Sequence, residues 1–309
     1  MRKIRIATRA SMLAMTQSEH VRDMIQSVCP DADISFVEVS TKGDRDKSDF
    51  LHKIESVGFF TSEVENALLN KHADVAVHSL KDLPTAITEG LTIAAIPRRE
   101  QVCDVMVSAN NIGSISDLPD GAKVGTSSLR RIAQLKHLRS DLNCLPLRGN
   151  IETRVSKLNS GEYDAIIIAQ AGLNRLSMSD CISAVLDPEE FVPAPGQGAL
   201  AIQTRTEDGE LRELLSKIDD QQARITTNIE RSILAKLHGG CSIPLGVYSR
   251  LENNEIYLVA VLSNTDATRY LKKTVRCKIS DLEKIAEKTA AELLDEGGRE
   301  ILGQTRKSD

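Results

Sequence analysis

Apolar residues in the first part of the chain follow two different spacings. Stretches with a strand-like period of two lie at 3–7, 34–39 and 73–78. The last stretch contains the β-branched residues Val75 and Val77, which favour a pleated backbone. Between these stretches the apolar positions recur at helical spacing, over 21–28 and 64–68. Strand, helix, strand, helix, strand is the order typical of a doubly wound α/β domain.

A second α/β pattern begins after an apolar strand at 91–96 and a polar crossing at 97–104. Its short predicted strands lie at 123–125, 142–147 and 164–169. A bend rich in proline and glycine at 192–198 then runs into another apolar strand, which predicts a return to the first domain.

The end of the chain has a different pattern. A long amphipathic helix carries Ile225, Ile229 and Ile233 on one face and stops at paired glycines. Strands joined by Asn-rich turns follow, and then a closing helix, at 245–250, 256–262, 270–279 and 281–295. This predicts a small α+β domain with an antiparallel three-stranded sheet. The predicted domains are 1–98 with 199–217, 99–198, and 218–309.

Ionisable and hydroxyl side chains gather where predicted strands end. The strand at 73–78 leads directly into Ser79, Lys81 and Asp82, and Pro84 ends regular structure there. The first strand ends at Arg9 and Ser11, beside a helix N-terminus that suits an anion. Because ligands of open α/β sheets bind outside the carboxyl ends of the strands, these residues are expected to line a crevice.

Arginines recur at three successive strand ends of the second pattern. A glycine turn and a helix start at 125–131 supply backbone N–H groups together with Thr126, Ser127, Ser128, Arg130 and Arg131. The next two strand ends bring Arg148, Asn150 as a helix cap, Arg154 and Arg175. Strands lying side by side would pool the five arginines at one rim, which predicts a site for a polyanion.

Composition restricts the function further. The chain has 309 residues, a net charge of −5 and an isoelectric point near 5.8, so it has no overall attraction for nucleic acid or an anionic membrane. No apolar run approaches the roughly 20 residues of a membrane span, and the N-terminus resembles a strand rather than a signal peptide, which favours the cytoplasm. The six cysteines form no C-x-x-C pair, so no metal site is predicted. Cys241 follows two glycines on a tight loop, where its sulfur is expected to be accessible.

The chain resembles the porphobilinogen deaminase (hydroxymethylbilane synthase) family along almost its whole length. Six motifs carry the resemblance in the right order: ATRAS at 7–11, VHSLKDLP at 77–84, GTSSLRR at 125–131, LRGN at 147–150, PGQGA at 195–199 and GGCSIP at 239–244. The resemblance implies two doubly wound domains like those of type II periplasmic binding proteins, plus a third domain. It also implies a dipyrromethane cofactor attached covalently to Cys241. Onto this primer a monomeric enzyme adds four porphobilinogen molecules, each with loss of ammonia, before hydroxymethylbilane is released.

The resemblance also implies residue roles. Asp82 matches the catalytic aspartate of the family. The family's binders of substrate and cofactor carboxylates match Arg9, Arg130, Arg131, Arg148, Arg154 and Arg175, with help from Ser11, Ser79, Lys81, Thr126, Ser127, Ser128, Asn150 and Gln197. Arginine suits this task because its guanidinium is always charged and binds carboxylates in a bidentate manner.

The polar, aperiodic loop after the second strand is either a lid over the site or a plain solvated loop. As a lid it would cover 42–60, with Lys53 and Phe60 as candidate substrate contacts. The family often has lysine where this chain has Val57, so Lys53 or Lys42 would have to take over a lid-to-substrate salt bridge.

Two other readings stay open from the sequence. A non-catalytic two-domain anion receptor would account for the arginines, although it leaves Cys241 unexplained. A nucleic-acid-binding regulator would use the basic rim for phosphates, although the acidic charge and 3% aromatic content disfavour it.

Overall fold

A computed structural model describes residues 2–40, 61–237 and 243–308, and beyond residue 303 it describes the backbone alone. The chain divides into two compact units. The first comprises Met1–Glu100 and Ala199–Ile225, and the second comprises Gln101–Gly198 and Thr226–Asp309. The finer division into three domains stays a prediction.

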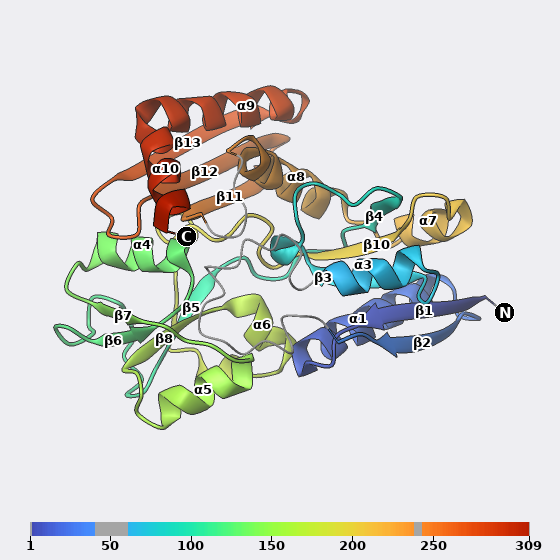
Figure 1. The fold of residues 1–309 in the computed structure, drawn as a ribbon, viewed down its shortest axis with the longest axis horizontal. Helices are drawn as coiled ribbons and strands as arrows, with labels where there is room; N and C mark the ends of the chain where they lie inside the picture. Colours follow the sequence, from blue (N-terminus) through green and yellow to red (C-terminus); the bar gives the residue numbers. More distant parts are fainter. Residues whose placement is uncertain (1, 41–60, 238–242, 309) are drawn as a thin grey trace. The chain divides into compact units, whose positions relative to one another are not determined.

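The first unit is built around a mixed five-stranded sheet of order β2-β1-β3-β10-β4 (Figure 1). Its elements are β1 (Lys3–Thr8), α1 (Met12–Val28), β2 (Asp33–Glu38), α3 (Ser62–Leu69), β3 (Val75–Ser79), β4 (Leu91–Ala95), β10 (Leu200–Arg205) and α7 (Gly209–Ser216). Strand β1 runs parallel to both β2 and β3, whereas β10 runs antiparallel to β3 and β4. The returning strand thus completes the first sheet, as the apolar stretch after the Pro-Gly bend predicted.

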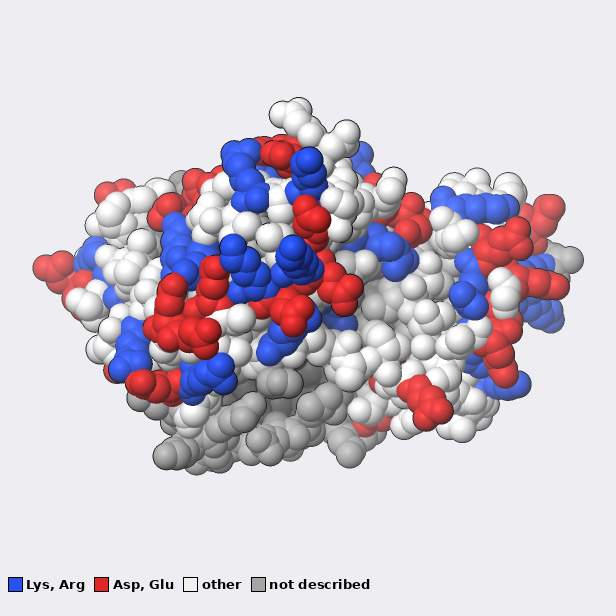
Figure 2. All heavy atoms as spheres, turned by 90° about the horizontal axis from the view of Figure 1, so that it is seen from above, with Lys and Arg blue, Asp and Glu red and all other residues white. Residues whose placement is uncertain are grey.

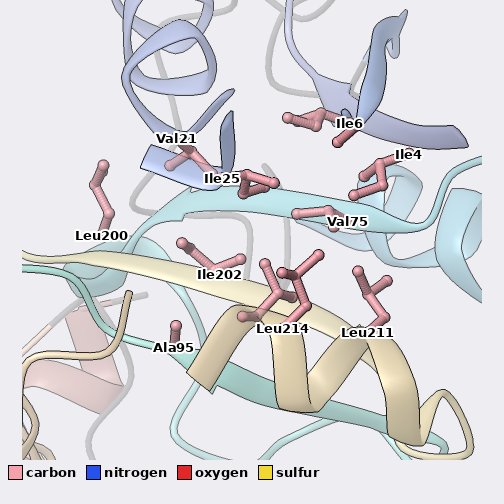
Figure 3. Packing of buried hydrophobic residues seen from close by; sticks show 12 residues of the cluster. Ile4, Ile6, Val21, Ile25, Val75, Ala95, Leu200, Ile202, Leu211 and Leu214 are labelled. Carbon is pink, nitrogen blue, oxygen red and sulfur yellow. The ribbon is translucent and has the colours of Figure 1, made fainter. Parts of the chain in front are cut away.

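Helices α1 and α7 cover the main core of the first unit (Figure 3). Val21 and Ile25 of α1 pack with the strand residues Ile6 and Val75, and Leu211 of α7 belongs to the same buried cluster. Helical spacing on α1 and strand alternation on β1 therefore bury a common apolar layer. Burial of each such side chain stabilises the unit by about 1.5–3 kcal/mol.

The second unit contains a sheet of order β7-β6-β8-β5-β9. Its elements are β5 (Asp104–Ser108), β6 (Lys123–Gly125), α4 (Leu129–Leu138), β7 (Asn143–Leu145), α5 (Ile151–Asn159), β8 (Ala165–Ala169), α6 (Gln170–Arg175) and β9 (Ala184–Val185). Strand β6 is parallel to β7 and β8, and β5 is antiparallel to β8 and β9. Both large sheets therefore share one topology. In each, the antiparallel strand, β10 or β5, is the first strand after the chain crosses over from the other large sheet.

The second unit also contains an antiparallel three-stranded sheet with helices (Figure 1). It consists of β11 (Leu245–Glu252), β12 (Glu255–Ser263), β13 (Tyr270–Lys278), α9 (Leu282–Leu293) and α10 (Arg299–Ser308). Asn253 and Asn254 join β11 to β12 with positive φ angles of 49° and 61°, as a tight two-residue hairpin requires. Helix α8 (Gln221–Lys236) precedes this sheet and continues across the boundary between the two units.

Basic and acidic side chains lie interspersed on the face shown in Figure 2. Ion pairs that involve the three-stranded sheet include Lys272–Glu190, at 3.1 Å, and Arg276–Glu252, at 3.4 Å. In the described part of the chain, no helix is long and apolar enough to cross a membrane.

Candidate functional site

The segment that carries Asp82 lies at the carboxyl end of β3. A single 3₁₀ turn over Leu80–Asp82 follows the strand; Leu80 is fully buried while Asp82 is exposed. The backbone N–H of Leu80 donates to the carbonyl oxygen of Ala199 at 3.0 Å, and Gln17 Nε2 donates to Ser79 Oγ at 3.1 Å. The strand therefore runs directly into a segment of ionisable side chains, as the sequence predicted, and the exposed carboxylate lies two positions after a buried leucine.

Arg9 and Ser11 reach the same edge of the first sheet, because β1 and β3 are parallel neighbours. Ser11 is the N-cap of α1, and its Oγ accepts a hydrogen bond from the backbone N–H of Ala14 at 3.3 Å. Arg9 is half-buried just before that helix start. One sheet edge thus holds a cation, two hydroxyl groups, Lys81 and an exposed carboxylate.

The three strand ends predicted to deliver arginines do lie side by side, since β7, β6 and β8 are adjacent and parallel. Ser127 Oγ donates to the carbonyl of Leu147 and accepts from its N–H, both at 3.0 Å, which joins two of these ends. Ser128 occupies the N-cap of α4 without a side-chain capping bond; instead Thr126 Oγ1 accepts from the Ser128 N–H at 3.2 Å. Ser128 therefore takes part in this helix start through its backbone N–H.

The turn around Arg148 is built as predicted. Asn150 caps α5, and its Oδ1 accepts from the Thr153 N–H at 2.8 Å. Gly149 has a φ of 110°, and a Cβ there would lie 2.8 Å or less from the Thr153 side chain, so only glycine fits. Arg154 Nε donates to the Gly149 carbonyl at 2.8 Å, which folds that arginine back over the turn.

Arg175 ends α6, and its Nη2 donates to the Gly198 carbonyl at 2.7 Å. Arg148, Arg154 and Arg175 are all half-buried, so each keeps part of its side chain in contact with solvent. These three arginines follow strand ends at one edge of the second large sheet, as predicted.

Arg130 and Arg131 behave differently, and the prediction of one exposed rim is wrong for them. Both are buried, and both contact the carboxylate of Asp104, with nitrogen-to-oxygen distances of 2.7 Å. Gln197 is also buried and donates through Nε2 to Asp104 at 3.0 Å and to the Val102 carbonyl at 2.8 Å. Asp104 itself has no exposed surface. All three of these predicted site residues therefore belong to one buried cluster around Asp104.

The opposite charges in the Asp104 cluster shift the pKa values of its members and leave the cluster with a net positive charge. Burial by itself raises the pKa of Asp104, but the adjacent positive charges of Arg130 and Arg131 outweigh burial and hold that pKa well below its usual range. Burial lowers the pKa of Arg130, against the raising effect of Asp104. Two guanidiniums share one carboxylate, so these three side chains carry a net charge of one positive unit (2 − 1).

Several partners of the site were not predicted from the sequence. Asp104 was taken as the end of a crossing, although a single acid just before an apolar strand could have suggested a buried counter-ion. Gln17 looked like one polar position among many on a helix. The predicted lid at 42–60, with Lys42, Lys53, Val57 and Phe60, and the loop thiol of Cys241 lie outside the described residues.

Fold and site together define a class: two α/β units of shared sheet topology, with cationic and hydroxyl groups at the carboxyl edges of their parallel strands, and an additional α+β element. The predicted fold class is thereby confirmed. Among solved structures, a periplasmic binding protein of Salmonella typhimurium with high arginine specificity is 13% identical, with a TM-score of 0.41 over 71% of this chain and 92% of that one. The BvgS VFT2 domain of Bordetella pertussis is 16% identical, with a TM-score of 0.42 over 70% and 86%.

Comparison of sequences gives the family. Residues 4–213 match the family described as porphobilinogen deaminase, dipyromethane cofactor binding domain, and residues 225–295 match the porphobilinogen deaminase C-terminal domain. The porphobilinogen deaminase of Syntrophobacter fumaroxidans is 42% identical over 301 residues, covering 97% of each chain. That of Oceanobacillus iheyensis is 43% identical over 308 residues, covering 99% of each chain. This chain belongs to the porphobilinogen deaminase family.

Proposed function

We propose that this chain polymerises four porphobilinogen molecules on a dipyrromethane primer carried by Cys241, and then releases hydroxymethylbilane. Porphobilinogen deaminase activity, EC 2.5.1.61, in tetrapyrrole biosynthesis and a dipyrromethane cofactor come with membership of the family. The observation that carries the assignment is the match of both family domains along nearly the whole chain. The stepwise mechanism, the anchor and the residue roles are proposed here.

The donor set of the second unit fits the cofactor. Dipyrromethane is a polyanion, because each of its two pyrroles carries an acetate and a propionate. Half-buried Arg148, Arg154 and Arg175 lie at one sheet edge, and the Asp104 cluster of the same unit adds one net positive charge. Hydrogen bonds between charged groups contribute about 1.5–3 kcal/mol each, so three arginines are enough to hold such a ligand. When bound, the cofactor supplies the pyrrole carbon to which the units are added.

Arg9 and Ser11 are proposed to orient the incoming porphobilinogen by its carboxylates, together with Ser79 and Lys81. These groups follow β1 and β3, which are parallel neighbours, so they meet at the edge that also presents Asp82. The side chains of Ser11 and Ser79 are held in place: Ser11 Oγ accepts from the Ala14 N–H at 3.3 Å, and Ser79 Oγ accepts from Gln17 Nε2 at 3.1 Å. Side chains fixed at the binding groups lower the cost of orienting the substrate.

Asp82 is proposed to act on the reacting pyrrole. Loss of ammonia from porphobilinogen leaves a resonance-stabilised cation, which an adjacent carboxylate stabilises electrostatically. The same carboxylate can accept the proton released when the new carbon–carbon bond forms and the pyrrole regains its aromaticity. Four porphobilinogen molecules and one water give one hydroxymethylbilane and four ammonia molecules, so the overall reaction balances.

A turnover assay tests this proposal. Incubation with porphobilinogen is expected to release four ammonia molecules for each linear tetrapyrrole. Asp82→Asn, which removes the charge and keeps the shape, is expected to lower kcat about 100- to 1000-fold, in line with the loss of one stabilising group. Asp23→Asn, on the exposed surface of α1, is the matched control. An Asp82→Asn enzyme with a normal rate would remove Asp82 from the mechanism.

We also propose that the enzyme is a monomer and that it acts in the cytoplasm. Light scattering on the purified protein tests the first, since a dimer would have twice the 33.8 kDa mass of the chain. Cell fractionation of the native host tests the second. The rival reading, a non-catalytic anion receptor, would account for the arginines but leaves the match of both family domains unexplained.

A further inference from the structure

A chain of buried hydrogen bonds runs through the first unit beneath the Asp82 segment. His78 Nε2 lies 3.1 Å from Gln203 Oε1, and Gln203 Nε2 donates to Glu65 Oε1 at 2.8 Å. Thr88 Oγ1 donates to the other oxygen, Glu65 Oε2, at 2.9 Å. His78, Gln203 and Glu65 are 6%, 0% and 8% exposed, and Thr88 is half-buried. We call these four residues the His78 network.

The donors and acceptors of the network fix its direction. The carboxyl group of Glu65 receives a hydrogen bond on each oxygen, from Gln203 and from Thr88. The Gln203 amide must therefore point its nitrogen at Glu65 and its oxygen at His78. His78 has to donate through Nε2, which leaves Nδ1 as the acceptor of a neutral ring. Burial favours that neutral form, because it lowers the pKa of His78 to about 4 against the raising effect of the Gln203 hydrogen bond.

The network holds both ends of the segment 79–87. His78 immediately precedes that segment at the end of β3, and Thr88 immediately follows it. Both residues connect to the same Glu65 on α3, one directly and one through Gln203 of β10. The segment between them contains Ser79, Lys81 and the exposed Asp82. A loop fixed at both ends by one buried carboxylate has far fewer accessible conformations than one fixed at a single end.

We propose that the His78 network positions the Asp82 carboxylate for catalysis, and that His78 and Thr88 are positioning residues of the reaction. This inference rests on the proposed function of Asp82. Displacement of a catalytic group by about 1 Å can cost roughly 100-fold in rate. Ser79 and Lys81 lie on this loop, but Arg9 and Ser11, which are also proposed to bind the substrate carboxylates, follow β1. Asp82 is the one group on the loop proposed to act on the reacting pyrrole, so loosening the loop changes the transition state more than substrate binding. Substitutions in the network should therefore lower kcat and leave KM nearly unchanged.

The test compares two pairs of variants in steady-state kinetics with porphobilinogen. In the first pair, His78→Gln keeps an amide N–H at the position of Nε2, whereas His78→Asn is too short to reach Gln203. In the second pair, Thr88→Val removes the hydroxyl that binds Glu65. Its matched control is Thr204→Val, which removes a buried hydroxyl that donates to the Asp74 carbonyl at 2.8 Å, at the far end of β3.

The proposal predicts a 10- to 100-fold lower kcat for His78→Asn and about 3- to 10-fold for Thr88→Val, with KM within about threefold of wild type. His78→Gln and Thr204→Val should retain near-normal kcat. Intact mass must show the same cofactor load in all variants, which separates catalysis from assembly. Equal losses in Thr88→Val and Thr204→Val would overturn the proposal, as would a KM that rises in step with the fall in kcat. A wild type without turnover would instead overturn the proposed function itself.

Thr88→Val keeps the test decisive if His78→Asn fails to fold, because Thr88 is only half-buried and the substitution preserves its shape. The His78 tautomer is a second, independent readout. Nitrogen NMR of the wild type should show the proton on Nε2. A proton on Nδ1 would contradict the direction of the network and, with it, the proposal.

Discussion

Replacing Asp104 with asparagine tests the account of the buried arginines most severely. Asp104 has no exposed surface, and its carboxylate contacts Arg130 and Arg131 at 2.7 Å each. Asparagine has almost the same shape, so the substitution opens no cavity. It removes one negative charge and raises the net charge of the three side chains from one to two positive units.

The size of the effect follows from the cost of burying unpaired charge. Removing one partner of a buried ion pair destabilises a protein by about 3–5 kcal/mol. Since one carboxylate serves two guanidiniums here, the upper part of that range is expected. The sign also follows: because the arginines hold the pKa of Asp104 below its unfolded value near 3.8, its stabilising effect is present above that value. That stabilisation is lost only as the pH falls through the lower pKa of the folded state.

Tyrosine fluorescence during urea unfolding measures the loss of stability in the second unit, which contains Asp104. The chain has no tryptophan, and its four tyrosines, Tyr163, Tyr248, Tyr257 and Tyr270, all lie in the second unit with Asp104. With a urea dependence of about 1–3 kcal/mol per molar, a loss of about 3–5 kcal/mol lowers the unfolding midpoint by roughly 1–5 M.

Asp141→Asn is the control for that experiment. Asp141 forms an equally short contact, 2.7 Å, with Arg139, but on the surface of the same unit, where ion pairs contribute little. Its midpoint should barely move. Equal shifts for Asp104→Asn and Asp141→Asn would refute the claim that burial of the arginine pair makes Asp104 essential to stability.

Three further predictions concern other parts of the site. The pKa of His78 is near 6.5 in the unfolded chain and about 4 in the folded protein, so the free energy of unfolding should fall by about 3 kcal/mol as the pH drops between those values. Urea unfolding of wild type and His78→Gln at pH 7 and pH 4.5 measures this loss. A difference in stability between the two proteins that is the same at both pH values would contradict it. Arg148→Gln should lower the fraction of purified protein that carries the cofactor, through the loss of about 1.5–3 kcal/mol of charged hydrogen bonding; intact mass measures that fraction, and an unchanged cofactor load would remove Arg148 from cofactor binding. Asn150→Ala should lower the stability of the second unit by about 1 kcal/mol, because the α5 cap to the Thr153 N–H is lost; tyrosine fluorescence in urea would show no shift if that bond contributed nothing.

Most of the fold could be predicted from periodicity, because strand alternation and helical spacing are strong along β1, α1 and β3. The antiparallel strand β5 was not predicted, because only four residues, VMVS, follow Asp104 in this strand, which is too short a stretch to show an alternation of apolar and polar positions. The short helix α7 was overlooked because the strand before it and the long α8 after it gave stronger signals. Helix α10 lies beyond residue 295, where the closing helix was predicted to end; the chain passes through Gly297 at a φ of 114° and starts a new helix.

The site was predictable wherever a side chain is placed by its own strand end, as for Asp82, Arg9 and the Asn150 cap. It was not predictable where a residue's environment depends on a distant partner. Arg130 and Arg131 look like surface cations in sequence, and only the approach of Asp104, 26 and 27 positions earlier, turns them into a buried cluster. Glu65 and Gln203, separated by 138 positions, form the His78 network for the same reason.

The intact mass of the purified protein, compared with that of a Cys241→Ser variant, shows whether Cys241 carries the primer. We expect the wild type to exceed the mass of its polypeptide by two linked pyrrole units, and the variant to have the bare polypeptide mass. A wild type with the bare mass, even after incubation with porphobilinogen, would contradict the account, and so would an added mass that persists in Cys241→Ser.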